Sequence, residues 1–250
     1  MSEIALITGA SAGIGREFAL QLAPQCKAMI LVARDAQKLE SLALTLREQG
    51  VDVSCIAADL LQPLGVSEVI EAVRQRGPVS MLINNAGFGT HGLFAESNID
   101  IQHNMVTLHC SATLALCRSV LPYMRTAGRG TIINVASLGS FFPMKHAVVY
   151  GASKAFLVAF SQGLVQEVAR ENITVQCLCP GYTHTEFHDR PTLSHFDTSV
   201  VPEKYWSSSA EVVSTSLAAL DKKAGTVVVI PGQNNLDNAK AALAGYLDSL

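Results

Sequence analysis

Charged residues are scarce in this sequence, and its basic residues do not cluster. Only 16% of the 250 residues are charged, the formal net charge is −3, and the longest run of basic residues is the pair Lys222–Lys223. Surfaces that bind nucleic acids or anionic lipids need clustered positive charge. The sequence therefore predicts neither a nucleic-acid partner nor a membrane-surface partner.

Cysteine spacings typical of metal sites are also missing. The six cysteines lie inside apolar runs, and none of them form a Cys-x-x-Cys pair. Cys177 and Cys179 would point to the same face of a strand, but a shared zinc ion would need further ligands nearby. We therefore expect reduced, buried thiols, no metal site and a cytoplasmic protein.

The sequence shows no sign of a targeting segment. Its N-terminus lacks a basic region before the first apolar residues, so we expect no signal peptide, and we expect no apolar run long enough to span a bilayer. Apolar residues make up 49% of the chain. A chain of this length and composition predicts one domain, residues 1–250, with a large core.

Short β-rich runs alternate with longer amphipathic stretches along the chain. This alternation predicts an α/β fold in which helices cover both faces of a parallel sheet. The expected strands are Ile4–Ile7, Ala28–Ala33, Val53–Ala57, Met81–Asn84, Thr131–Val135, Thr174–Cys179 and Thr226–Ile230. The expected helices are Gly13–Leu22, Ala36–Gln49, Val66–Gln75, Ile101–Thr126 and Tyr150–Arg170.

One segment, residues 182–205, breaks this alternation. It is polar, contains two prolines and includes several aromatic residues. A long insertion of this kind in a compact domain favours a substrate lid, and the alternative is a passive surface loop. The tail from Gly232 to Leu250 predicts a short helix that could form part of a subunit contact.

The first expected strand leads directly into the glycine-rich segment Thr8–Gly15. Gly9, Gly13 and Gly15 would allow a tight turn and close backbone approach, so that the N-terminus of the next helix faces a pyrophosphate. Similar turns bind flavins or methyl donors, or serve packing alone. The order strand, turn, helix nevertheless favours a dinucleotide.

Residues at the ends of the next strands indicate which dinucleotide binds. An NAD site usually has an acidic residue at the end of the second strand, where this sequence has Ala33 followed by Arg34. An arginine there can hold a 2′-phosphate, although Arg34 could also be a solvated residue before the next helix. Asp59 could accept a hydrogen bond from the adenine amino group or cap a turn, and Asn84–Gly87 suits either a ribose contact or a tight turn. We therefore expect NADP(H), with NAD(H) the less favoured cofactor.

Tyr150 and Lys154 are four residues apart at the start of an expected helix, so their side chains share one face. The unperturbed pKa of a phenol is about 10, and a nearby ammonium would lower it toward the range useful for proton exchange with an alcohol. Ser137 follows the fifth expected strand, at the edge where ligands bind, and could polarise the same substrate oxygen. These three side chains predict an active site for a carbonyl/alcohol pair.

Together the motifs resemble the short-chain dehydrogenase/reductase family over essentially the whole chain. Thr8–Gly15 is similar to its cofactor loop, Asn84–Gly87 to its Asn-Asn-Ala-Gly motif and Pro180–Thr185 to its motif beside the nicotinamide, and the three catalytic candidates have its spacing. The resemblance implies a single-domain, Rossmann-type doubly wound parallel sheet of about seven strands. It also implies hydride transfer between NAD(P)H and a carbonyl/alcohol pair, and a homodimer or homotetramer. The expected cofactor contacts are Gly9, Ser11, Gly13, Ile14, Gly15, Arg34, Asp59, Asn85, Ala86, Gly87, Tyr150, Lys154, Pro180, Gly181, Thr183 and Thr185.

His109 departs from the family's pattern. Family members usually have an asparagine in the long helix before Leu121–Pro122, where it anchors a water that leads to the lysine, and counting back gives His109 here. Because histidine titrates near neutrality, His109 could hold that water or relay the proton itself as a fourth catalytic residue. Alternatively, it is a tolerated core residue and the relay is weakened. Asn104 lies on a different helix face and is a poor substitute.

The expected substrate pocket is mainly apolar and aromatic. Its expected wall comprises Ser137, His91, Phe142 and Tyr182, with Phe141, Met144, His146 and Phe187 as further candidates. This composition favours a medium-sized hydrophobic carbonyl compound, and no arginine stands in an obvious position to clamp a carboxylate. The leading hypothesis is an NADP(H)-dependent oxidoreductase. The alternatives are a catalytically impaired NADP(H)-binding sensor or scaffold, supported only by His109, and a different Rossmann enzyme such as a methyltransferase.

Overall fold

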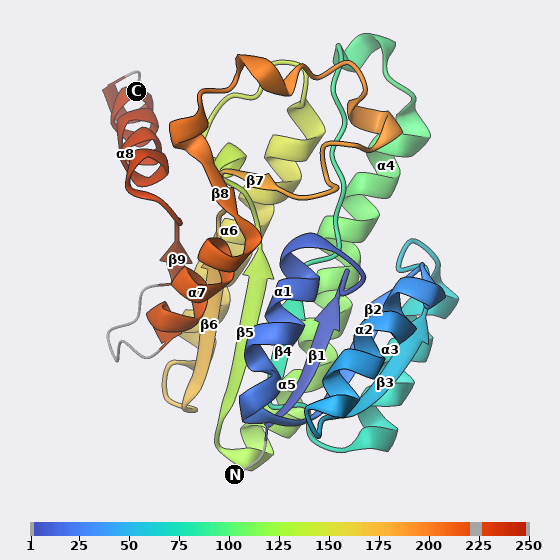
Figure 1. The fold of residues 1–250 in the computed structure, drawn as a ribbon. Coiled ribbons are helices and arrows are strands. Elements are labelled where there is room, and N and C mark those ends of the chain that lie inside the picture. The colour runs from blue at the N-terminus through green and yellow to red at the C-terminus, as the bar shows by residue number, and fades with distance from the viewer. Residues whose placement is uncertain (1–2, 221–226, 249–250) are drawn as a thin grey trace.

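A parallel sheet forms the centre of the computed structural model, which describes residues 3–220 and 227–248 (Figure 1). Seven strands are hydrogen-bonded in the order β3-β2-β1-β4-β5-β6-β9, and every pairing among them is parallel. The strands are β1 (Glu3–Thr8), β2 (Cys26–Ala33), β3 (Asp52–Ala57), β4 (Met81–Asn84), β5 (Gly130–Val135), β6 (Ile173–Leu178) and β9 (Val228–Val229). The expected α/β fold with about seven strands is therefore confirmed.

Helices cover both faces of this sheet, as Figure 1 shows. One face carries α1 (Gly13–Leu22), α2 (Ala36–Glu48) and α7 (Ser209–Leu220), and the other carries α3 (Pro63–Arg76), α5 (Thr113–Ala127) and α6 (Val148–Val168). The strands are nearly unbroken apolar runs because both of their faces are buried in this way. Consecutive residues of β1 show this two-sided burial: Ile7 belongs to one core and Leu6 to the other, and both are fully buried.

The helix expected at 101–126 is one continuous helical run with an irregular middle. It consists of α4 (Ile99–Val106), a π-helical turn at Thr107–Ala112 and then α5. A π-turn inserts one extra residue per turn and changes which side chains face inward. This turn contains His109, which is buried.

The C-terminal part of the chain differs in detail from the expectation. The last expected strand is reduced to β9, and its first expected residue, Thr226, lies outside the described residues. The tail forms α8 (Gln233–Asp248), a longer helix than expected, which stands beside the sheet edge in Figure 1.

The 182–205 segment is less irregular than its sequence indicates. It begins with β7 (Tyr182–His184), which pairs with β8 (Trp206–Ser208), the strand immediately after the segment. This strand pairing holds the two ends of the segment side by side. The 3₁₀ turns Pro191–Leu193, Thr198–Val200 and Glu203–Tyr205 lie between them. Figure 1 shows the segment crossing above the carboxyl ends of the strands.

Two helical runs, Ile99–Ala127 and Val148–Val168, are long and apolar enough to cross a membrane by length and composition alone. The expectation that no run reaches this length is therefore wrong on that criterion. The core helices of globular proteins pass the same test, and both runs bury residues such as Leu116 and Leu164 against the sheet. The finding is weak evidence for a membrane span.

The strand order reverses between β1 and β4, and this reversal positions the site. Open parallel sheets bind ligands outside the carboxyl ends of the strands at such a switch point. The glycine-rich segment follows β1, Asn85 follows β4, Ser137 follows β5 and Pro180 follows β6. The fold therefore brings the predicted motifs to one edge of the sheet.

Candidate active site

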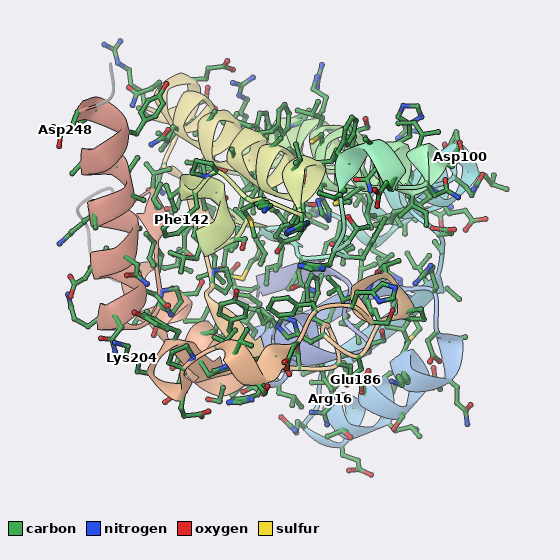
Figure 2. All side chains as sticks on the ribbon, turned by 90° about the horizontal axis from the view of Figure 1, so that it is seen from above. Arg16, Asp100, Phe142, Glu186, Lys204 and Asp248 are labelled. Carbon is green, nitrogen blue, oxygen red and sulfur yellow. The ribbon has the colours of Figure 1, made fainter. Side chains whose placement is uncertain are left out.

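A cleft of about 1200 Å³ opens at the carboxyl edge of the sheet. Figure 2 looks onto this edge and shows Glu186 near α1 and α2, with Phe142 across the molecule on the side of α8. Of the predicted cofactor contacts, the wall contains Gly9, Ser11, Gly13, Ile14, Arg34, Asn85, Ala86, Gly87, Tyr150, Lys154, Pro180, Gly181, Thr183 and Thr185. Ser137 also lines the cleft, whereas Gly15, Asp59 and His109 do not.

The glycine-rich segment forms an open cradle tied to the neighbouring loop. Gly9 has φ +65°, and a Cβ atom there would lie 2.7 Å from Asn85 Nδ2. Thr8 Oγ1 accepts the backbone N–H groups of Asn85 at 2.9 Å and Ala86 at 3.0 Å. The first residue before α1, Ala12, provides no side-chain cap, so the N–H groups of the first turn stay available to an anion. These features fit the pyrophosphate of a dinucleotide.

The end of β2 offers a cation and no free acid. Arg34 is exposed on the cleft wall. The adjacent Asp35 caps α2, because its carboxylate accepts the Lys38 backbone N–H at 2.9 Å. An adenosine 2′-phosphate would therefore meet a guanidinium here, and the residues present fit NADP(H).

Asp59 uses its carboxylate within its own turn. Its Oδ1 accepts the Leu61 backbone N–H at 3.0 Å, and Leu61, rather than Asp59, lines the cleft. The structure thus contains the turn-capping arrangement that was the alternative for this residue. A contact with the adenine amino group stays a prediction.

Ser137, Tyr150 and Lys154 converge on the floor of the cleft. A hydrogen-bonding interaction with Ser137 lowers the pKa of the Tyr150 phenol, and Ser137 Oγ accepts the Gly139 backbone N–H at 3.1 Å. Lys154 Nζ lies 5.9 Å from the centroid of the Tyr150 ring and donates to the Val135 carbonyl at 2.9 Å. Two of the three ammonium hydrogens of Lys154 are not needed for that bond and can serve ribose hydroxyls.

Burial controls the proton affinities of the two groups. Burial raises the pKa of the Tyr150 phenol, and the hydrogen bond from Ser137 opposes this rise. The lowered phenol pKa that the sequence predicts from Lys154 is therefore not found, because burial outweighs the stabilisation of the phenolate. Burial also lowers the pKa of the Lys154 ammonium to about 8, although the thiols of Cys177 and Cys179 oppose that effect.

His109 connects the loop after β4 with the catalytic helix α6. Its Nε2 accepts the Phe88 backbone N–H at 3.2 Å, so Nδ1 carries the proton and donates to Ser153 Oγ at 2.8 Å. The Ser153 hydroxyl in turn donates to the Tyr150 carbonyl at 2.9 Å. Burial, followed by the charges of Lys154 and Arg190, lowers the pKa of His109 well below its ordinary value. His109 is therefore a neutral bridge between the loop after β4 and α6, and proton relay through it stays a prediction.

The substrate side of the cleft is aromatic. His91, Phe142 and Tyr182 line it, as do the further candidates Met144 and Phe187. Phe141 instead packs beside a small core cluster, and His146 does not lie on the wall. Around the 182–205 segment, Tyr182 stacks on Phe196 with ring centroids 5.9 Å apart.

The thiols Cys177 and Cys179 are buried behind this site, with sulfur atoms 3.9 Å apart. All six cysteines are free. Among residues 3–220 and 227–248, no group of three or more histidine, cysteine or acidic residues is arranged to hold a metal ion.

Several cleft residues are not evident from the sequence. Arg190, from the 182–205 segment, lies on the wall, together with Asn235 and Asn238 from the start of α8. Asn235 is buried and packs so closely on Gly181 that a Cβ atom there would lie 2.5 Å from Asn235 Nδ2. An irregular segment and a tail helix have no pattern that shows which side chains point inward, so no sequence signal identifies these residues.

Comparisons with known proteins agree with this geometry. The family model described as short chain dehydrogenase matches residues 3–192. A Streptomyces violaceoruber protein named as a ketoacyl reductase of the granaticin polyketide synthase is 36% identical over 190 residues, which cover 75% of this chain and 70% of that protein.

Solved structures resemble the whole chain. A short-chain dehydrogenase from Sphingobium yanoikuyae in complex with NADPH superposes with a TM-score of 0.85 at 33% identity, covering 99% of this chain and 96% of that one. An alcohol dehydrogenase from Comamonas testosteroni, described as specific for bulky-bulky ketones, has a TM-score of 0.81 at 32% identity, covering 99% and 94%.

Proposed function

The chain belongs to the short-chain dehydrogenase/reductase family, and on that basis we propose that it is an NADP(H)-dependent oxidoreductase of a carbonyl/alcohol pair. One observation carries the proposal: Ser137, Tyr150 and Lys154 meet on the floor of a cleft that also contains an open phosphate cradle. Arg34 at the end of β2 supports NADP(H) over NAD(H), and the Sphingobium yanoikuyae structure is described as an NADPH complex.

The proposed chemistry divides among the three residues. NADPH, when bound, supplies a hydride to the carbonyl carbon. Ser137 donates a hydrogen bond to the substrate oxygen, and Tyr150 donates the proton that the oxygen needs as it becomes an alcohol. Because burial raises the pKa of Tyr150, its phenol is protonated at neutral pH and ready to act as an acid. This state favours reduction of a carbonyl over oxidation of an alcohol.

Lys154 and His109 support the phenol in different ways. The Lys154 ammonium stabilises the phenolate left after proton transfer and holds the ribose hydroxyls of the cofactor. His109 keeps the Phe88 backbone and the catalytic helix in register through its two hydrogen bonds. The three catalytic groups remain in place beside it, so His109 gives no reason to favour a non-catalytic sensor.

We propose a hydrophobic substrate of medium or large size. The aromatic side chains of Phe142, Tyr182 and Phe187 on the cleft wall support this class. Two relatives are described as acting on compounds consistent with it, namely ketoacyl groups and bulky ketones. A panel of aldehydes, ketones and 3-oxoacyl thioesters, followed by NADPH oxidation, would narrow the class.

Removal of the Tyr150 hydroxyl tests the mechanism. In Tyr150→Phe, we expect carbonyl-dependent NADPH oxidation to fall at least about a hundredfold, because the general acid is lost. The dissociation constant for NADPH should stay unchanged, since the ring still fills its place. Steady-state kinetics and fluorescence titration measure the two quantities. A variant that keeps wild-type turnover would overturn the mechanism, and a wild-type protein that binds NADPH but reduces nothing in the panel would favour the sensor.

Three further features belong to this proposal. The 182–205 segment acts as a substrate lid, supported by its position over the carboxyl ends of the strands. The protein forms a homodimer or homotetramer, a common arrangement in the family, and it is cytoplasmic. Light scattering on purified protein measures the subunit number.

A further inference from the structure

Arg190 is a cation of the 182–205 segment that forms no ion pair with any residue of 3–220 or 227–248. Its side chain is partly buried on the wall of the cleft, and its guanidinium carbon lies 5.8 Å from the centroid of the Phe187 ring. Within the described parts of the chain, no carboxylate oxygen lies within 4 Å of its nitrogens. A partly desolvated guanidinium without an acid is costly unless an anion joins it.

The neighbouring residues show where this part of the segment lies. The Thr185 side chain lies against Gly13 of the phosphate cradle, since a Cβ atom on Gly13 would be 3.0 Å from Thr185 Cγ2. The Phe187 ring lies against Gly89, where the corresponding distance to Cζ is 3.2 Å, and its centroid is 6.2 Å from that of Tyr150. Residues 185–187 therefore cross the cleft from the cradle to the catalytic tyrosine, and Arg190 follows them.

The charges agree with a position over the middle of the cleft. Burial lowers the pKa of the Arg190 guanidinium, and the nearby charge of Arg34 lowers it further. Arg190 in turn contributes to the low pKa of His109, which bonds Ser153 next to the catalytic residues. Glu186 raises the pKa of Arg190, but its carboxylate is already paired with Lys38 at 2.8 Å. Arg190 is thus close enough to interact both with Arg34, at the adenosine end, and with His109, beside the catalytic residues.

We infer that Arg190 binds the pyrophosphate of NADP(H) from the lid side, opposite the cradle of residues 9–15. A guanidinium fits this group because it forms two parallel, charge-assisted hydrogen bonds to phosphate oxygens. The contact joins the lid to the cofactor, so cofactor binding orders the wall of the substrate pocket. The inference rests on the proposed NADP(H) chemistry.

Binding measurements on matched variants separate this role from others. Arg190→Gln, Arg34→Gln and Arg118→Gln each remove one positive charge, and Arg118 is an exposed residue of α5 outside the cleft. Fluorescence titration gives the dissociation constants for NADPH and NADH. Both cofactors contain the pyrophosphate, and only NADPH contains the 2′-phosphate. Limited proteolysis of the lid with and without NADPH provides a second readout that does not depend on turnover.

We expect Arg190→Gln to weaken NADPH and NADH binding by the same factor, roughly ten- to a hundredfold. Arg34→Gln should weaken NADPH alone, and Arg118→Gln should change neither. NADPH should protect the lid from proteolysis in the wild type and less so in Arg190→Gln. Arg190→Lys should fall between the wild type and Arg190→Gln, because it keeps the charge but loses the paired geometry.

Other outcomes overturn the inference. A loss confined to NADPH would assign Arg190 to the 2′-phosphate, and unchanged binding of both cofactors with a raised KM for an anionic substrate would assign it to the substrate. Unchanged cofactor binding in Arg190→Gln, with the wild type binding normally, defeats this inference but leaves the proposed function standing. A wild-type protein that binds neither cofactor defeats both.

Discussion

At the scale of single residues, the site works by balancing burial against hydrogen bonding. Burial holds the proton on Tyr150, and the Ser137 hydroxyl is the neighbour that favours its release. Lys154 pays a similar cost, since its ammonium is buried against the Val135 carbonyl. The acid/base behaviour of the phenol therefore depends on Ser137 more directly than the spacing of Tyr150 and Lys154 indicates.

Ser137→Ala should change the pH dependence as well as the rate. Loss of its hydrogen bond raises the pKa of Tyr150 further, so in alcohol oxidation the limb that requires phenolate should move to higher pH. We also expect kcat to fall by at least about tenfold, because the substrate oxygen loses a donor. Initial rates across a pH series measure both effects.

Ser140→Ala is the matched control for this prediction. Ser140 lies in the 3₁₀ turn Leu138–Phe141, which follows Ser137, and its buried hydroxyl has no hydrogen-bond partner among the described residues. Its removal should leave the pH profile in place. If Ser137→Ala lowers the rate without moving the profile, Ser137 acts on the substrate only.

Sequence reasoning identifies residues whose chemistry depends on local spacing. Tyr150 and Lys154 are one helical turn apart, and the glycines of the cradle follow a strand, so both are visible in the chain order. Arg190 and Asn235 reach the cleft through the path of a lid and a tail helix, which no local pattern encodes. Asp59 shows the opposite limit, because a carboxylate at a strand end caps a turn as readily as it meets a ligand.

At the scale of elements, the main departure from expectation is the π-turn between α4 and α5. Apolar spacing predicts a helix across this region, and the helix is present. No glycine or proline marks residues 107–112, so the sequence does not reveal the π-turn. Its consequence is local: His109 is turned inward against Phe88 and Ser153. π-Turns of this kind occur frequently at functional sites.

His109→Phe tests this bridge between elements. Phenylalanine fills similar space but leaves the Phe88 N–H and the Ser153 hydroxyl without their partner, so at about pH 7.5 we expect a loss of about 1–3 kcal/mol in the free energy of unfolding. The cost should shrink toward about pH 5. The reason is that the folded pKa of His109 lies well below its ordinary value, so wild-type stability falls as the unfolded chain takes up a proton below about pH 6.5. The variant lacks His109, so its stability does not fall for this reason.

Urea unfolding at both pH values measures these free energies. His103→Phe, at an exposed position of α4, is the control and should be nearly neutral at both. A cost of His109→Phe that grows as the pH falls would mean that His109 is protonated in the folded protein, and would revive it as a proton relay.

At the scale of the whole molecule, the fold follows from the two-sided burial of the strands. The alternation of apolar runs and amphipathic stretches predicts helices on both faces of the sheet. The two cores on either side of β1 confirm this prediction. The same burial surrounds Lys154, whose side chain reaches from α6 to the end of β5 and which is only 5% exposed. The molecule therefore gives up stability to keep an ammonium in its active site.

Lys154→Met should reveal that cost through its pH dependence. The folded pKa of Lys154 is about 8, below the 10.5 of an ordinary lysine. Below about pH 8 both the folded and the unfolded chain hold the proton on Lys154, and the full cost of burying the charge is present.

As the pH rises from about 8 toward 10, the folded protein releases its proton first, so wild-type stability increases relative to that of the variant. The free energy of unfolding of the variant minus that of the wild type should fall by on the order of 2 kcal/mol between about pH 7.5 and 9.5. Urea unfolding of both proteins measures it. Lys27→Met, at an exposed position of β2, should show a constant difference. If Lys154→Met does so too, the ammonium has the same pKa in the folded and unfolded chains, and burial does not lower it.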